Sequence, residues 1–161
     1  MTRTTLTSQL QSYPEPVAEQ DLDQEVAELL RIADQRYTTG RRRLVAVLDS
    51  AHGPLTIGEI IAADTTQAQS SVYRNLTVLE DAGAVTRVIT KDEFARYELA
   101  EQFTHHHHHL ICNSCGSVQD VALDAATEKS LDRALHKAAA PTGFQVEGHQ
   151  LDLLGLCASC V

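Results

Sequence analysis

The four cysteines of this sequence constrain its fold more than any other feature. They form two Cys-x-x-Cys pairs, Cys112 with Cys115 and Cys157 with Cys160, and no further cysteine is present. Two such pairs supply the four thiolates of a tetrahedral zinc site. Gly116, directly after the first pair, permits the positive φ that such a turn often needs. Two disulfides or a redox dithiol are the alternatives, and disulfides are disfavoured because residues 1–20 lack the apolar core of a secretory signal.

A run of five histidines, His105 to His109, leads directly into the first cysteine pair. In an extended segment, His105, His107 and His109 share one face, while His106 and His108 share the other. One strand could therefore feed two metal sites on opposite faces, and a solvated run without a function is the alternative. Further ligands could come from Asp120 and His149, on the strand-like segments 116–121 and 149–156, and from Glu128 on a helical segment.

The composition is that of a globular protein and argues against a membrane-spanning one. Hydrophobic residues make up 43% of the 161 residues without any tryptophan, so aliphatic side chains must build the core. No apolar run approaches the roughly 18 residues of a transmembrane helix. The net charge of −9 argues against a generally basic surface, but residues 31–76 hold six arginines against four acidic residues. We expect the polar residues 1–20 to be a flexible extension.

Helical periodicity followed by a hairpin describes the first half of the chain. Apolar stripes predict helices over 21–33 and 40–51, and a short third helix capped by Thr56. A longer helix is expected to begin at Thr65 or Thr66 and to end at Gly83. Two strands are expected over 84–90 and 95–100, around the polar turn 91–93.

Helices followed by a hairpin are the order of a winged helix, whose third core helix enters the major groove of DNA. The exposed face of the long helix offers groups that can contact phosphates and base edges. Those groups belong to Ser70, Ser71, Tyr73 and Arg74. A structural helix could carry the same residues.

Several motifs together resemble the ferric uptake regulator family in unbroken order over residues 25–161. Residues 71–83, SVYRNLTVLEDAG, resemble its recognition helix, and residues 36–44 resemble the helix that precedes the winged core. The wing around 97–99, the histidine run with the first cysteine pair, and residues 149–160 complete the pattern.

The resemblance implies an α+β fold, with an N-terminal winged-helix DNA-binding domain over 21–101 and a small α/β dimerisation domain over 102–161. It also implies a homodimeric, cytoplasmic repressor without enzymatic activity, organic substrate or membrane association. Such a repressor binds palindromic double-stranded operator DNA when a divalent metal is bound, and it controls genes of metal uptake or homeostasis. The DNA-binding positions that it implies are Arg41, Ser70, Ser71, Tyr73 and Arg74.

The family's metal sites map onto this sequence residue by residue. The four cysteines match a structural Zn²⁺ site. The regulatory site at the hinge matches Glu98, His107, His109 and Asp120. A second site matches His106, His108, Glu128 and His149, with Glu128 chosen over its neighbour Thr127 because only the carboxylate can coordinate. A further regulatory ligand of the family would fall at Pro54-Leu55, and His52 is the nearest substitute.

A shell of carboxylates and imidazoles without cysteine favours Fe²⁺ as the regulatory metal, with Zn²⁺, Mn²⁺ or Ni²⁺ as alternatives. Peroxide-sensing members of the family tend to have Asp where Glu98 stands, which argues against that function. Outside the family, a zinc enzyme or a metal-storage protein would account for the histidines. No second catalytic residue accompanies Glu98, however, and a storage protein needs no arginine-bearing winged helix.

Overall fold

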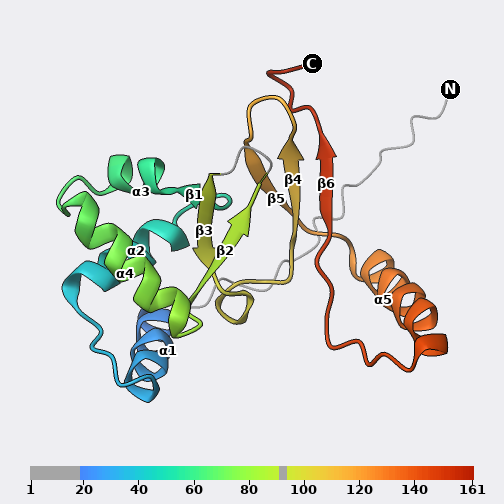
Figure 1. Cartoon of the computed structure of the whole chain (residues 1–161), viewed down its shortest axis with the longest axis horizontal. Helices are drawn as coiled ribbons and strands as arrows, with labels where there is room; N and C mark the ends of the chain where they lie inside the picture. Colours follow the sequence, from blue (N-terminus) through green and yellow to red (C-terminus); the bar gives the residue numbers. More distant parts are fainter. Residues whose placement is uncertain (1–18, 91–93) are drawn as a thin grey trace, which may run out of the picture.

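The computed structural model describes residues 19–90 and 94–161. It has an α+β fold in which two small sheets lie side by side, and the first four helices lie against the first of them, on the side away from the second (Figure 1). The predicted extension over 1–20 lies outside the described residues except for its last two, which begin the first helix.

The N-terminal half contains four helices and a three-stranded antiparallel sheet. The strands run in the order β1-β3-β2, so β3 lies in the centre. The helices are α1 (Glu19–Ile32), α2 (Thr39–Asp49), α3 (Ile57–Ala63) and α4 (Gln69–Asp81). The strands are β1 (Leu55–Thr56), β2 (Val85–Ile89) and β3 (Ala95–Leu99).

The predicted apolar stripes meet in one core between these helices and this sheet. Each large aliphatic side chain buried there stabilises the fold by about 1.5–3 kcal/mol relative to exposure. The fully buried members include Val26 and Leu30 of α1, Leu44 of α2, Ile60 of α3, and Leu76 and Leu79 of α4.

A side-chain cap explains where α3 begins, and a turn before α4 accounts for its later start. Thr56 caps α3 as predicted, because its hydroxyl accepts from the Glu59 amide and the Glu59 carboxylate accepts from the Thr56 amide. The prediction that the long helix begins at Thr65 or Thr66 is wrong, since α4 begins at Gln69. Asp64 instead accepts a hydrogen bond from the Thr66 amide, at 3.0 Å, and holds residues 64–66 in a turn.

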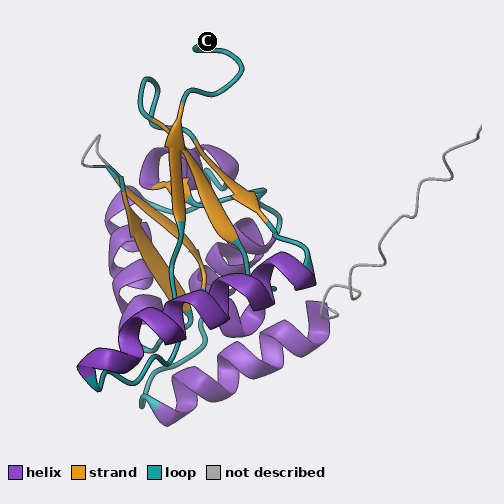
Figure 2. Ribbon diagram, turned by 90° about the vertical axis from the view of Figure 1, so that its right-hand side faces the viewer, coloured by secondary structure: helices purple, strands orange, loops and turns teal. Residues whose placement is uncertain are grey.

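The C-terminal half is a three-stranded sheet of order β5-β4-β6 with one long helix. Strand β4 (His108–Cys112) pairs antiparallel with β5 (Val118–Val121) and parallel with β6 (Asp152–Gly155). Helix α5 (Ala125–Ala139) leaves the sheet at one end, and none of its residues is buried within the described chain (Figures 1 and 2). The prediction that His149 lies on a strand is wrong, because β6 begins only at Asp152.

The two halves are joined by a short 3₁₀ helix, η1 (Glu101–Phe103), between β3 and β4. They also meet where Gly53 passes β5: a Cβ atom on this glycine would lie 3.1 Å from the Val118 carbonyl oxygen. Because no side chain intervenes, the loop before β1 can lie directly against the second sheet. No helix among the described residues is long and apolar enough to cross a membrane.

Candidate metal centres

The four cysteine side chains gather at one end of the second sheet. Parallel pairing of β4 with β6 places Cys112 opposite Gly155, so the two cysteine pairs follow neighbouring strands. The four sulfur atoms all lie within 4.8 Å of one another, and Cys115 Sγ is 3.7 Å from Cys157 Sγ. With Zn–S bonds of about 2.3 Å, sulfurs of a tetrahedral site lie about 3.8 Å apart. This cysteine cluster is therefore consistent with a structural Zn²⁺ site.

Backbone amides favour the thiolate form of Cys112, the form that a metal requires. The amides of Cys115, Cys157 and Ser114 lower the pKa of the Cys112 thiol to about 6, and the Cys157 amide lies 3.3 Å from Cys112 Sγ. Gly116 has φ +71°, as expected for the turn that closes the first pair. All four thiols are free rather than disulfide-bonded.

A second set of side chains, which we call the hinge cluster, joins the two halves of the molecule. It consists of Glu98, His107, His109 and Asp120. Glu98, on β3, places Oε2 3.3 Å from His107 Nε2 and 3.2 Å from His109 Nε2. Asp120, opposite His109 on β5, places Oδ1 3.9 Å from both of these nitrogens. Donor atoms of a tetrahedral shell of nitrogen and oxygen ligands lie about 3.3–3.6 Å apart, so this set fits a divalent metal.

Burial and charge shift the pKa values within the hinge cluster. Burial raises the pKa of Glu98, but hydrogen bonds from His107 and His109 outweigh it, so the net pKa is lowered. The hydrogen bond with Glu98 is the main cause that raises the pKa of His107 to about 9. Burial raises the pKa of Asp120, a carboxylate that a nearby cation would favour in its charged form.

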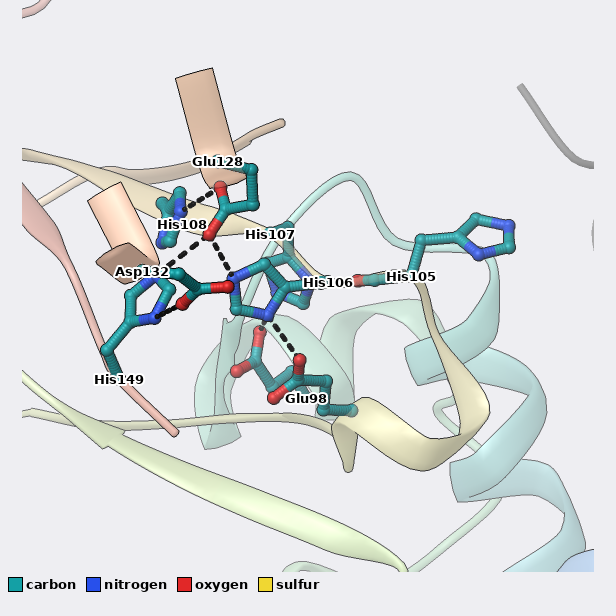
Figure 3. Close-up of polar contacts among 9 residues, drawn as sticks. Glu98, His105, His106, His107, His108, Glu128, Asp132 and His149 are labelled. Carbon is teal, nitrogen blue, oxygen red and sulfur yellow. Dashed lines mark hydrogen bonds and ion pairs between the residues drawn. The ribbon is translucent and has the colours of Figure 1, made fainter. Parts of the chain in front are cut away.

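Histidines from the opposite face of the run contribute to another set of side chains, which we call the second cluster. It consists of His106, His108, Glu128 and His149. The Nε2 atoms of the three histidines converge on the Glu128 carboxylate, at 3.2, 3.1 and 2.9 Å, respectively (Figure 3). His149 Nε2 is buried and, among the described residues, has no partner with hydrogen-bond geometry. A buried ring nitrogen aimed at a carboxylate without a hydrogen bond fits a metal ligand.

The alternation predicted for the histidine run is confirmed with one exception. His107 and His109 enter one cluster, and His106 and His108 enter the other. His105, which was predicted on the face of His107, points away from both (Figure 3). Its backbone carbonyl nevertheless accepts a hydrogen bond from His107 Nδ1, at 2.7 Å.

Three further carboxylates, which the sequence motifs do not predict, contact the clusters. Asp152 Oδ1 lies 3.4 Å from His109 Nδ1, and Asp132 Oδ1 lies 3.1 Å from His149 Nδ1. Glu101 contacts His106 Nδ1. Only Asp132 had a signal in the sequence, since it follows Glu128 by one helical turn. His52, the suggested substitute ligand, lies outside the hinge cluster, although its charge slightly opposes the rise that burial causes in the pKa of Asp120.

Helix α4 presents polar side chains away from the core. Ser70, Tyr73 and Arg74 are exposed and Ser71 is partly exposed, while Val72 points inward. Arg74 lies along its own helix, with Nε 3.2 Å from the Ser70 carbonyl oxygen. These side chains are therefore available for contacts outside the chain.

The arginines of α2 are engaged within the N-terminal half. The Arg41 guanidinium donates to the Arg36 carbonyl oxygen. Arg42 pairs with Asp23 of α1, and Arg43 donates to the Thr66 hydroxyl. Arg42 and Arg43 are nevertheless exposed.

Known proteins with similar sequences and structures indicate one family for this chain. The profile of the ferric uptake regulator family matches residues 33–154. The peroxide-responsive repressor PerR of Staphylococcus epidermidis is 30% identical over 144 residues, which is 87% of this chain and 90% of that protein. The ferric uptake regulator of Vibrio cholerae is 27% identical with a TM-score of 0.66, covering 81% of this chain and 98% of that one. That of Helicobacter pylori has a TM-score of 0.72 at 23% identity, covering 92% and 97%.

A winged helix followed by a sheet with cysteine, histidine and carboxylate clusters defines a metal-dependent transcriptional regulator rather than an enzyme. The chain belongs to the ferric uptake regulator family. Regulators of this family bind operator DNA, typically as dimers. The predicted α+β fold, in which helices and a hairpin precede a second, α/β unit, is confirmed.

Proposed function

We propose that this chain is a homodimeric repressor that binds palindromic operators, in the cytoplasm, when a divalent metal occupies the hinge cluster. Fe²⁺ is the metal that we expect, and the target genes are those of metal uptake or homeostasis. The DNA-binding domain comprises residues 21–101 and the dimerisation domain residues 102–161. The observation that carries the proposal is the position of Glu98, whose carboxylate leaves the central strand of the first domain and lies between two histidines of the second.

The ligand set explains how the hinge cluster could act as a switch. When bound, the metal supplies positive charge that ligands from both domains share. Without that charge, the Glu98 and Asp120 carboxylates repel each other, and the rings of His107 and His109 must be partly protonated to hold Glu98. In the apo protein the contact between the domains therefore depends on ring protonation, and it weakens as the pH rises through the pKa of His107, about 9. A preference of about 3 kcal/mol for the closed arrangement would shift the equilibrium roughly 150-fold.

The second cluster and the cysteine cluster would hold two further metals. Three imidazoles and the single carboxylate of Glu128 provide a complete tetrahedral set. The four thiolates would hold structural Zn²⁺, which contributes directly to folding of the C-terminal half. The DNA contacts would come from Ser70, Ser71, Tyr73 and Arg74 on α4, with Arg41 on the neighbouring helix.

Dimer formation is supported by an apolar surface that the single chain leaves open. Leu110 on β4 lies opposite Leu153 on β6, and both side chains are more than one third exposed. Leu154 and Leu156 are more than half exposed on the same edge strand or directly after it. An exposed edge strand that carries leucines is suited to pairing with a second copy.

The test is fluorescence anisotropy with DNA from upstream of the protein's own gene. The protein is treated with a chelator that empties the histidine clusters but leaves the cysteine zinc, and Fe²⁺, Mn²⁺, Zn²⁺ and Ni²⁺ are titrated separately without oxygen. We expect one metal, Fe²⁺ first, to drive tight binding at a buffered free concentration near its cellular level. Equal DNA binding with and without every metal would overturn the proposal.

Peroxide sensing is the second candidate function, because the similar staphylococcal proteins are named peroxide-responsive repressors. A glutamate in the hinge cluster argues against it. Treating the Fe²⁺-loaded and the Mn²⁺-loaded protein with hydrogen peroxide separates the two functions. Release of DNA from the Fe²⁺ form alone would favour peroxide sensing, and equal retention of DNA would favour regulation by metal supply.

A further inference from the structure

Two histidines of the second cluster, His106 and His149, use both ring nitrogens. Their Nε2 atoms face Glu128, and their Nδ1 atoms meet carboxylates outside the cluster. His149 Nδ1 lies 3.1 Å from Asp132 Oδ1, and His106 Nδ1 contacts Glu101 Oε1. A metal-bound histidine commonly donates its other N–H to a carboxylate, which fixes the ring and makes it a stronger ligand. Asp132 and Glu101 are therefore chemically equivalent partners of this cluster.

The two carboxylates differ in the part of the molecule that holds them. Asp132 lies on α5, one turn after Glu128, so its contact with His149 stays within the C-terminal half. Glu101 begins η1, whose turn is closed by a hydrogen bond of 2.8 Å from the Phe103 amide to the Ala100 carbonyl. The Phe103 side chain is buried in the core of the N-terminal half. Glu101 therefore moves with that half, and its contact with His106 is a contact between the two halves.

The same short segment serves both clusters. Glu98 enters the hinge cluster, and Glu101, three residues later, reaches the second cluster. The partners of these two carboxylates, His107 and His106, are also neighbours in the chain. One cavity is lined by Glu98, Glu101 and the histidines of both clusters. Metal in either cluster would thus favour the same arrangement of the two halves.

On the basis of the proposed metal sites, we propose that Glu101 is a positioning residue that couples the second cluster to the hinge cluster. With a cation on Nε2, the N–H at Nδ1 of His106 becomes a stronger donor and holds Glu101, together with Glu98, beside the histidines. Metal binding at the second cluster then raises the metal affinity of the hinge cluster. Metal binding at the hinge cluster raises the affinity of the second cluster by the same factor. Asp132 orients His149 within the second cluster but does not link that cluster to the hinge cluster.

The experiment compares Glu101→Gln with the matched control Asp132→Asn, using Co²⁺ as the probe because its absorption differs between coordination sets. Both side chains are at least half exposed, at 63% and 51%, so both variants are expected to fold. A His107→Ala background isolates the second cluster. There, both variants should weaken Co²⁺ binding by about 10–100-fold, the usual effect of losing an outer partner of a ligand.

The hinge cluster is then titrated at Co²⁺ levels that fill the second cluster. Glu128→Ala, which removes a ligand of the second cluster, should weaken Co²⁺ binding at the hinge cluster by about 5–150-fold, the usual range of coupling between sites. Glu101→Gln should weaken it similarly, whereas Asp132→Asn should match the wild type. Wild-type hinge affinity in Glu101→Gln, or an equal loss in Asp132→Asn, would overturn the coupling and leave the proposed function standing. If Glu128→Ala bound as many Co²⁺ ions as the wild type, the second cluster would not be a metal site, and the proposed coupling would be wrong as well.

Discussion

His106 and His107 are adjacent in the chain, but their rings enter two different clusters, one on each face of the segment that leads into β4. Each ring meets a glutamate near the end of the wing: His107 meets Glu98 on β3, and His106 meets Glu101 in η1 directly after it. The arrangement brings a proposed switch site and a proposed accessory site to the same junction between the two halves. Events at either cluster are therefore expected to affect how the DNA-binding part is held.

Removing one hinge ligand should separate metal response from folding. In His107→Ala, we expect metal affinity at the hinge cluster to fall by more than the roughly 10–100-fold that loss of an outer partner costs, and metal-stimulated DNA binding to disappear. The dimer should stay folded by circular dichroism. His105→Ala is the matched control, because it keeps the backbone carbonyl that bonds His107 and removes a side chain outside both clusters. Equal anisotropy titrations for the two variants would contradict the assignment.

Metal affinity at the hinge cluster should rise with pH. Glu98 raises the pKa of His107 in the metal-free protein from 6.5 to about 9, so a metal must displace a proton from this ring at neutral pH. The same shift means that the metal-free fold gains stability below about pH 6.5 and loses it as the pH rises through 9. Calorimetric titration of Mn²⁺ at several pH values, in buffers of different ionisation enthalpy, measures the released proton. A constant affinity from pH 6.5 to 9 would rule out this protonation.

The cysteine cluster should act on stability rather than on the switch. Cys112→Ser should lose zinc and unfold the C-terminal half, because structural zinc binding contributes its free energy directly to folding. Asn113→Ala changes an exposed side chain in the same turn and should keep zinc and stability. Zinc content and thermal unfolding test both variants. If Cys112→Ser kept its zinc and its melting temperature, the cluster would not be a structural site.

DNA binding should depend on salt through Arg74. We expect Arg74→Ala to weaken operator binding and to reduce the slope of log K against log salt by about 1, if the guanidinium contacts one phosphate. Arg133→Ala, on α5, removes the same charge far from α4 and should leave the slope unchanged. Anisotropy titrations between 50 and 200 mM salt, about the range over which such slopes are measured, distinguish the two variants. An identical slope in Arg74→Ala would exclude a phosphate contact for this residue.

Dimerisation should depend on the leucines of β6. Leu153→Asp would bury a carboxylate at the proposed interface, so we expect the dimer to dissociate at concentrations where the wild type is dimeric. Glu25→Lys changes the charge of an exposed residue on α1 and should leave the dimer intact. Light scattering after size exclusion gives the mass of each variant. A dimer in Leu153→Asp would place the interface elsewhere.

The sequence by itself determined the presence of the four N-terminal helices, the strands of the wing, each cysteine pair and the two faces of the histidine run, because each follows from local periodicity or short spacing. Val26 and Leu30 repeat at helical distance, and His106 to His109 alternate as an extended chain must. The start of α4 was misplaced because Asp64 captures Thr66 in a turn, and such a bond between a side chain and the backbone competes with helix formation.

Only the tertiary structure decided which carboxylates meet which histidines outside the family motifs. Asp152 lies opposite His109 because β6 pairs in parallel with β4, across 43 residues of chain, and no local pattern sets that register. Glu101 reaches His106 because η1 is held by the core of one half while the histidine belongs to the other. Contacts of this kind depend on how two packed units meet, and that is fixed by long-range pairing and packing rather than by the residues on either side.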